Sequence, residues 1–125
     1  MKSQWINYKD KRILHIDLSN FKEDLKGFEA ELTAAVTTIG QEMYQQPPHS
    51  VLVLVDLRNT AMTSTAQKML TERIKDTRQY VKKTAVVGMT GLRRMYLDFF
   101  AHIAGSDTAP FDDPESAKEW LVNAK

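Results

Sequence analysis

Cysteine is absent from this 125-residue sequence. Its absence excludes disulfide bonds, thiolate metal sites and a cysteine nucleophile. A chain without cysteine suits a reducing compartment, so we expect a cytoplasmic protein. The segment Met1–Tyr8 contains Trp, Asn and Gln and no apolar run, which is unlike a secretory signal peptide.

A large excess of one charge is also missing. Seventeen Lys and Arg against 16 Asp and Glu give a formal net charge of +1, which provides no overall field to attract nucleic acid or an anionic membrane. The longest apolar run, Val51–Val55, is far too short to cross a bilayer. Gly88-x-x-Gly91 is neither a Walker nor a dinucleotide-binding motif. We therefore expect no nucleic-acid partner, no membrane span and no cofactor.

The chain begins with the pattern of an antiparallel hairpin. Residues Trp5–Tyr8 alternate in character, Lys9-Asp10-Lys11 is a polar turn, and Arg12–Leu18 is typical of a strand. A long amphipathic helix follows, with Ser19 or Asn20 as its cap.

The apolar residues of that helix recur in steps of three and four, which places them on one face. They are Phe21, Leu25, Phe28, Leu32, Val36, Ile39 and Met43. A glycine in a helix costs about 1 kcal/mol relative to alanine. We therefore expect a bend or an early end near Gly40.

The remaining sequence alternates between apolar strands and helical stretches. Val51–Val55 contains no polar residue, as expected for a central strand covered on both faces. The later elements are a helix at Thr63–Tyr80, a strand at Thr84–Gly88, a helix at Gly91–Ala104, an edge strand at Ala109–Phe111 and a last helix beginning at Asp112-Asp113-Pro114. This order predicts one α/β domain over residues 1–125, with a mixed sheet of about five strands and four helices.

Several stretches resemble a known family. The strand ending Leu54-Val55-Asp56-Leu57 and the loop to Thr63-Ser64-Thr65-Ala66 resemble STAS domains, the modules of anti-sigma-factor antagonists and sulfate-transporter tails. The downstream stretches Lys83–Gly88 and Gly91–Arg94, and the ending Pro110–Asp113 with Ala117–Leu121, look more like the stand-alone SpoIIAA-like group. The resemblance covers nearly the whole chain and implies a SpoIIAA-like fold. For that group it implies binding of a small apolar or lipid-like molecule, or of a protein partner, without established chemistry.

In the antagonist proteins, the loop before the second helix carries a tetrad similar to Asp-Ser-Ser-Gly, and its first Ser is phosphorylated by a partner kinase. The resemblance places this tetrad on Thr63-Ser64-Thr65-Ala66 and the phosphorylated position on Ser64. Thr63 stands where Asp is usual, and Ala66 stands where Gly is usual. The hydroxyl is present, but the surrounding motif departs from the family pattern.

Two loops are the candidate binding surface. Ligands of open α/β sheets collect beyond the carboxyl ends of parallel strands, and this rule selects Asp56, Arg58, Asn59, Thr60, Thr63 and Ser64. The second loop contributes Gly88, Gly91 and Arg93, since glycines permit close backbone approach and arginine binds phosphate or carboxylate. The alternative interpretation is that Thr63 only caps the helix and Asp56 only holds the loop.

An apolar pocket between the second and third helices is a further possibility, lined by Met62, Met69, Met89, Met95 and Phe99. Flexible methionine side chains suit adaptable apolar surfaces. Such a pocket would serve a small apolar or lipid-like ligand, and an exposed apolar helix face would serve a homodimer. Ordinary core packing explains the same residues.

The three histidines, His15, His49 and His102, share no spacing such as His-x-x-x-His and have no adjacent acid at ligand spacing, so we expect no metal site. A triad of Ser64, His102 and Asp56 lacks the Gly-x-Ser-x-Gly elbow that would support it. We therefore expect no catalytic residues, and a binding or regulatory module rather than an enzyme.

Overall fold

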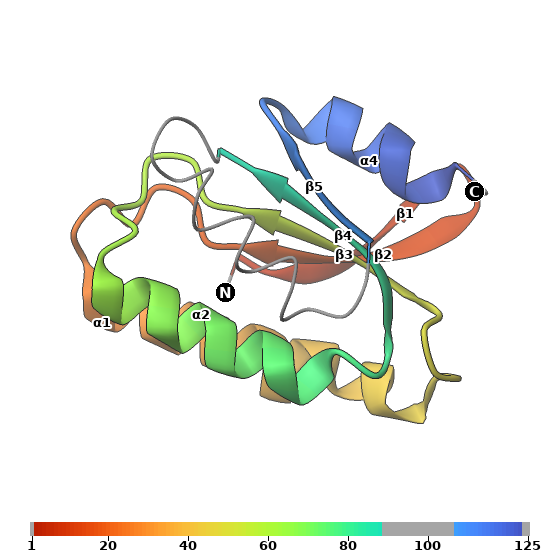
Figure 1. Cartoon of the computed structure of the whole chain (residues 1–125), viewed down its shortest axis with the longest axis horizontal. Helices are drawn as coiled ribbons and strands as arrows, with labels where there is room; N and C mark the ends of the chain where they lie inside the picture. Colours follow the sequence, from red (N-terminus) through yellow and green to blue (C-terminus); the bar gives the residue numbers. More distant parts are fainter. Residues whose placement is uncertain (1, 89–106, 124–125) are drawn as a thin grey trace.

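The computed structural model describes residues 2–88 and 107–123. They form a five-stranded sheet in the order β1-β2-β3-β4-β5, in which β1 is antiparallel to β2 and all other neighbours are parallel (Figure 1). This confirms the predicted mixed sheet with parallel central strands. The strands are β1 (Gln4–Tyr8), β2 (Lys11–Asp17), β3 (Val51–Asp56), β4 (Val81–Val87) and β5 (Asp107–Phe111).

The predicted hairpin is present at the start of the chain. Lys9 and Asp10 form a two-residue connection with φ angles of 48° and 67°, and Tyr8 pairs with Lys11 across it. Positive φ at both central residues matches the twist of the flanking strands. In the sheet order, β1 of the hairpin lies at one edge and β5 lies at the other.

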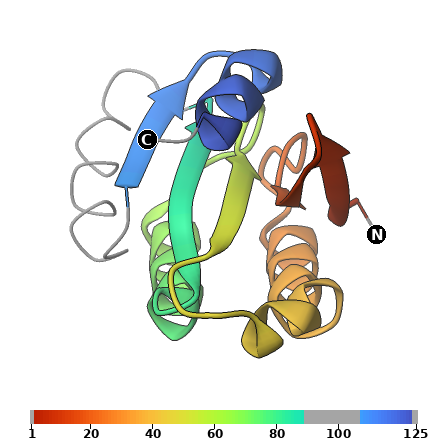
Figure 2. The ribbon, with the colours of Figure 1, turned by 90° about the vertical axis from the view of Figure 1, so that its right-hand side faces the viewer.

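Helices cover both faces of the sheet, as Figure 2 shows end-on. The helices α1 (Leu25–Thr37) and α2 (Ser64–Thr77) lie on one face, and α4 (Pro114–Val122) lies on the other. A 3₁₀ helix, η1 (Ile39–Gln45), follows α1. The described residues thus contain three α-helices where the sequence predicts four. The remaining predicted helix, over 91–104, lies outside the described residues.

The first helix corrects a sequence prediction. It begins after Asp24, whose carboxylate accepts a 2.9 Å hydrogen bond from the Gly27 amide, and not after Ser19 or Asn20. The intervening residues form a loop that is hydrogen-bonded through its backbone to residues 56–61, so they are not part of the helix. The expected break near Gly40 is confirmed, since the α-helix ends at Thr37 and η1 contains Gly40.

Two hydrophobic cores share the sheet. The larger lies against α1, α2 and η1 and includes Leu14, Ile16, Phe28, Val53, Val55 and Leu70. The smaller lies under α4 and includes Ile13, Leu52, Leu54, Ala85, Val87 and Leu121. Because side chains alternate between faces along a strand, β3 contributes to both cores, and all six of its residues are buried.

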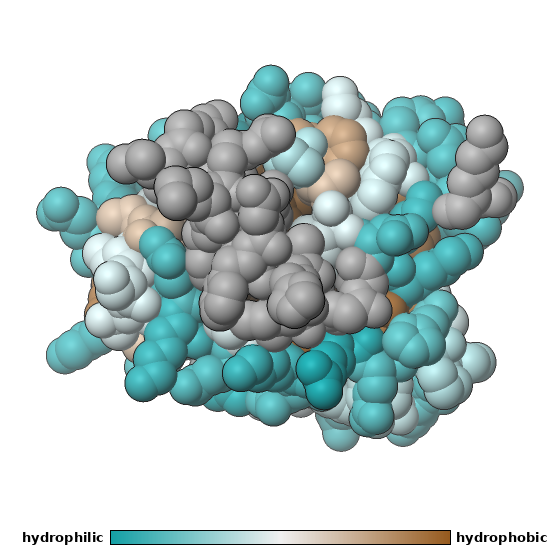
Figure 3. All heavy atoms as spheres, viewed as in Figure 1, coloured by the Kyte–Doolittle hydropathy of each residue, from teal (hydrophilic) through white to brown (hydrophobic). Residues whose placement is uncertain are grey.

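Among the described residues, Leu25 and Tyr44 are the exposed large hydrophobic side chains. On the face shown in Figure 3, hydrophobic residues form small separate patches among hydrophilic ones. Within residues 2–88 and 107–123, no helix combines the length and the apolar character needed to cross a membrane.

A buried carboxylate on α1 holds the segment before β1. Glu31 is only 7% exposed and accepts hydrogen bonds from the backbone amides of Lys2, at 3.1 Å, and Ser3, at 2.7 Å. The Ser3 hydroxyl accepts in turn from the Asp17 amide at 3.0 Å. Burial raises the pKa of the Glu31 carboxyl, but the hydrogen bonds from Ser3 and Lys2 outweigh it and lower that pKa overall.

We expect Glu31→Gln to lower the free energy of unfolding at pH 7 by about 1.5 kcal/mol, because two amides then lose a charged acceptor. Since the folded-state pKa is depressed, the carboxylate stabilises the fold fully above its unfolded pKa of about 4.3. This stabilisation is lost as the pH falls through the folded-state value. Urea denaturation from pH 7 to pH 3 should show wild type and variant converging in acid. Glu29→Gln, on the exposed side of α1, should change little, and an equal loss there would contradict the assignment.

Candidate functional site

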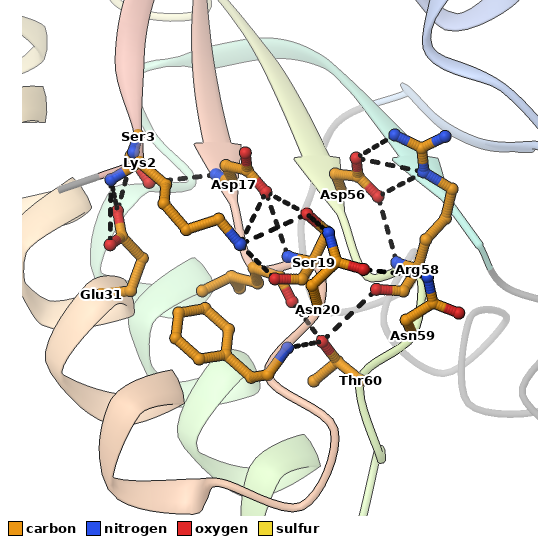
Figure 4. Close-up of polar contacts among 12 residues, drawn as sticks. Lys2, Ser3, Asp17, Ser19, Asn20, Glu31, Asp56, Arg58, Asn59 and Thr60 are labelled. Atoms are coloured by element: carbon orange, nitrogen blue, oxygen red, sulfur yellow. Dashed lines mark hydrogen bonds and ion pairs between the residues drawn. The ribbon is translucent and has the colours of Figure 1, made fainter.

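Two loops beyond the carboxyl ends of β2 and β3 lie side by side (Figure 4). They are the β2–α1 loop (18–24) and the β3–α2 loop (57–63). Backbone hydrogen bonds of 2.8–2.9 Å join Leu18 to Asp56, Asn20 to Arg58, Lys22 to Asn59 and Ala61 back to Lys22. This ladder continues the sheet past its regular strands. The two loops therefore present one continuous surface.

Thr60 links the two loops from the inside. It is 3% exposed, and its hydroxyl donates to the Leu18 carbonyl at 2.6 Å and accepts from the Phe21 amide at 3.1 Å. The Asn59 side-chain amide donates to the Asn20 side-chain oxygen at 2.9 Å. Thr60 and Asn59, both candidate binding residues from the sequence, thus have clear structural roles in holding the loops together.

Asp56, the last residue of β3, forms a bidentate ion pair with Arg58 of the β3–α2 loop. The Arg58 side chain donates to both Asp56 oxygens at 2.8–3.2 Å, and the Arg58 backbone amide donates to Oδ1 at 3.0 Å. The Asp56 side chain is 3% exposed, whereas the Arg58 side chain is 46% exposed. Hydrogen bonding to Asp56 raises the pKa of Arg58. The predicted alternative role of Asp56, holding the loop, is confirmed.

The start of α2 lies at the end of the same loop. The Thr63 hydroxyl accepts from the Ala66 amide at 3.2 Å and caps the helix, as the sequence predicts. Ser64 is the first residue of α2 and is exposed. A phosphate at this position would lie beside helix amides that have no partner within the helix, an arrangement that favours anions.

A groove lies between the two loops and the first turns of α1 and α2. Its volume is about 360 Å³, within the usual range of small-molecule sites. Phe28, at 1% exposure, lies at its base. We call it the loop groove; it is lined by Lys22, Glu23, Asp24, Leu25, Phe28, Thr60, Ala61, Thr63 and Thr65. The sequence-based candidates do not include residues 22–28 of this groove, because the apolar periodicity predicts a helix there.

Gly88 brings the second predicted loop next to the first. Its φ angle is +94°, and a Cβ atom there would lie 2.9 Å from the Arg58 backbone nitrogen. Only glycine accommodates this conformation and this contact without strain. The prediction that both loops share one location therefore holds for Gly88. Gly91 and Arg93 lie outside the described residues.

The predicted apolar pocket is only partly described. Met62 and Met69 are partly buried and pack against the larger core. Met89, Met95 and Phe99 lie outside the described residues, as does His102 of the considered triad. Met62 and Met69 therefore lie at the edge of the larger core, and the pocket itself stays a prediction.

One cluster of metal-ligating side chains is found within the described residues. His15, Asp17 and Asp56 each offer a ligand atom, and these atoms lie within 4.8 Å of one another. Burial lowers the pKa of His15. Ser19 donates two hydrogen bonds to Asp17, and these lower its pKa despite the opposing effect of burial. In the sequence, His15-Ile16-Asp17 is the pattern that indicates part of this cluster, because residues two apart on a strand lie on the same face.

The comparisons with known proteins identify the architecture. No family model matches the sequence, and no curated protein matches it. The structure is similar to that of an uncharacterized protein from the DUF3478 family with a SpoIIAA-like fold from Shewanella loihica PV-4. The TM-score is 0.68 at 12% sequence identity, over 95% of this chain and 91% of the other. This chain has a SpoIIAA-like fold.

The SpoIIAA-like fold confirms the architecture that the sequence resemblance implied. At 12% identity the similarity concerns the fold alone.

Proposed function

We propose that this chain is a non-enzymatic STAS-like binding or regulatory module that recognises a small ligand or a protein partner at the loops following its parallel strands. The observation that carries the proposal is the loop groove, which lies at the carboxyl end of the sheet where α/β domains bind ligands. Its 360 Å³ volume is sufficient for a small molecule or for one or two side chains of a partner.

The rigidity of the two loops supports this role. The backbone ladder, the Thr60 hydroxyl and the Asn20–Asn59 contact hold the β2–α1 and β3–α2 loops in one arrangement. A preorganised site loses less conformational entropy when it binds. The groove also combines the apolar Phe28 and Ala61 with threonine hydroxyls, a mixture that fixes a ligand and orients it.

Ser64 is the proposed regulatory position of this module. Its exposed hydroxyl lies at the start of α2, between the groove residues Thr63 and Thr65. A phosphate there would add nearly two negative charges at the rim of the groove. Phosphorylation would therefore change what the groove binds. Carriage of a small apolar or lipid-like molecule is the alternative function, and native mass spectrometry of freshly purified protein would reveal such a ligand directly.

The groove is tested with a blocking substitution. We expect ¹⁵N-labelled protein, titrated with a fragment library of carboxylates, phosphates and aromatic amides, to show shifts concentrated at residues 22–28 and 60–65. Ala61→Trp fills the groove and should weaken the best fragment at least about tenfold. Lys75→Trp places the same side chain on an exposed part of α2 away from the groove, and should bind like wild type. Shifts elsewhere on the surface, or equal binding by Ala61→Trp, would refute the groove as the site.

A further inference from the structure

A second polar cluster lies on the opposite face of the sheet from the loop groove. Asp17 and Asp56 are register neighbours at the ends of β2 and β3, and both carboxylates are visible beyond these strands in Figure 4. His15, two residues before Asp17, shares its face of β2. This is the α4 face, because Ile13 and Leu54 on the same rows pack in the α4 core.

His15 has an unexplained buried atom. Its Nε2 atom is inaccessible to solvent and has no hydrogen-bond partner among residues 2–88 and 107–123, although a buried polar atom without a partner costs about 1–3 kcal/mol. Such atoms are rare and call for a ligand, water or ion. A ring nitrogen of a neutral imidazole carries a lone pair that can coordinate a metal ion.

The Asp17 and Asp56 carboxylates place two negative charges next to each other on neighbouring strands. Like charges directly opposite each other on neighbouring strands destabilise a sheet. Here cations offset them: Arg58 pairs with Asp56, and the Lys2 ammonium lies 3.6 Å from Asp17 Oδ1. Both cations come from flexible side chains that are 37–46% exposed, so either can move into water and be replaced.

We propose that His15, Asp17 and Asp56 form a binding site for a divalent transition-metal ion, with Zn²⁺ as the best fit. One imidazole nitrogen and two carboxylate oxygens are ligands that Zn²⁺ accepts, and three protein ligands leave a position open. Ligands around tetrahedral Zn²⁺ lie about 3.4 Å apart. The observed limit of 4.8 Å thus requires small side-chain rotations. Zinc takes the place of Arg58 beside Asp56, and the site is independent of the loop groove.

Isothermal titration of chelator-stripped protein with Zn²⁺ tests the proposal. We expect one saturable site per chain. His15→Phe and Asp17→Asn, which nearly preserve side-chain shape, should weaken it at least about tenfold. His49→Ala is the matched control, since His49 lies apart from the cluster and its ring contacts the Val81 carbonyl; it should bind like wild type.

The competing cation provides a second, opposite test. Arg58→Met removes the positive charge beside Asp56 and should tighten zinc binding several-fold, since the metal no longer competes with the guanidinium. A chance surface site elsewhere would not respond in this way. The proposal is overturned by an absence of saturable binding, by wild-type affinity in His15→Phe, or by weaker binding in Arg58→Met. Circular dichroism of each metal-free variant establishes that it is folded.

Discussion

Truncating Phe28 to alanine is expected to lower the free energy of unfolding by about 4 kcal/mol, the largest effect that we predict for a single side chain. Phe28 is 1% exposed and belongs to the larger core between α1 and the sheet. The substitution loses the transfer free energy of an aromatic ring and leaves a cavity in the core. Such changes lower the free energy of unfolding by about 3–5 kcal/mol. Urea denaturation at 25 °C, followed by circular dichroism, measures this loss as a shift of the midpoint at nearly constant slope.

Leu25→Ala is the matched control for Phe28→Ala. Leu25 lies one turn earlier on the same helix and also lines the loop groove, but it is 38% exposed. Its truncation should cost less than about 1 kcal/mol. If the two variants lost equal stability, Phe28 would not be the core contact that the structure shows. The pair also separates folding from binding, because Leu25→Ala alters the groove while preserving the core.

Replacing Arg58 with methionine is expected to cost about 2 kcal/mol in metal-free protein. The reason is an asymmetry of burial: the Asp56 side chain is 3% exposed and the Arg58 side chain 46%. Loss of the guanidinium leaves a buried carboxylate without its ion-pair partner, and an unpaired buried charge is costly. We place the loss below the usual 3–5 kcal/mol, because the Arg58 end is already hydrated.

A double-mutant cycle measures this interaction directly. Arg58→Met should lower the free energy of unfolding much less in an Asp56→Ala background, because no buried carboxylate is then left without its ion-pair partner. Arg78→Met, at an exposed arginine that follows α2, serves as the control for loss of positive charge alone. Thermal and urea unfolding should be recorded with a chelator present, because bound zinc would mask the loss. An additive cycle, with the same cost in both backgrounds, would show that the ion pair contributes nothing.

The candidate site was predictable where its residues act locally. Thr63 precedes an amphipathic stretch and carries a hydroxyl, so its role as a cap follows from neighbouring sequence, and the structure confirms it. Asp56 follows a run of apolar β residues, which places it at the carboxyl end of a central strand. The ion-pair partner of Asp56 was not predictable in the same way. The contact depends on the backbone turn after β3, which brings the Arg58 amide and guanidinium to the Asp56 carboxylate.

The β2–α1 loop shows why periodicity alone misplaced the start of α1. Phe21 and Leu25 fit the helical spacing of the later apolar residues, so the pattern extended the helix back toward Ser19. In the folded chain, residues 18–24 gain hydrogen bonds from the β3–α2 loop, almost forty positions away. These long-range bonds outweigh local helix propensity, which is worth only fractions of a kcal/mol per residue.

By itself, the sequence determined the order of the described elements, the parallel centre of the sheet and the burial of β3 on both faces. These follow from apolar periodicity, turn residues and caps such as Thr63, all of which act over a few neighbouring residues. Only the tertiary structure decided which loops meet, that Lys83 is buried and donates to the Trp120 and Asn123 carbonyls at the end of α4, and that His15 lies beside two carboxylates. The physical reason is that periodicity specifies the face on which a side chain lies, whereas its neighbours on that face depend on strand register and on contacts between residues distant in the chain.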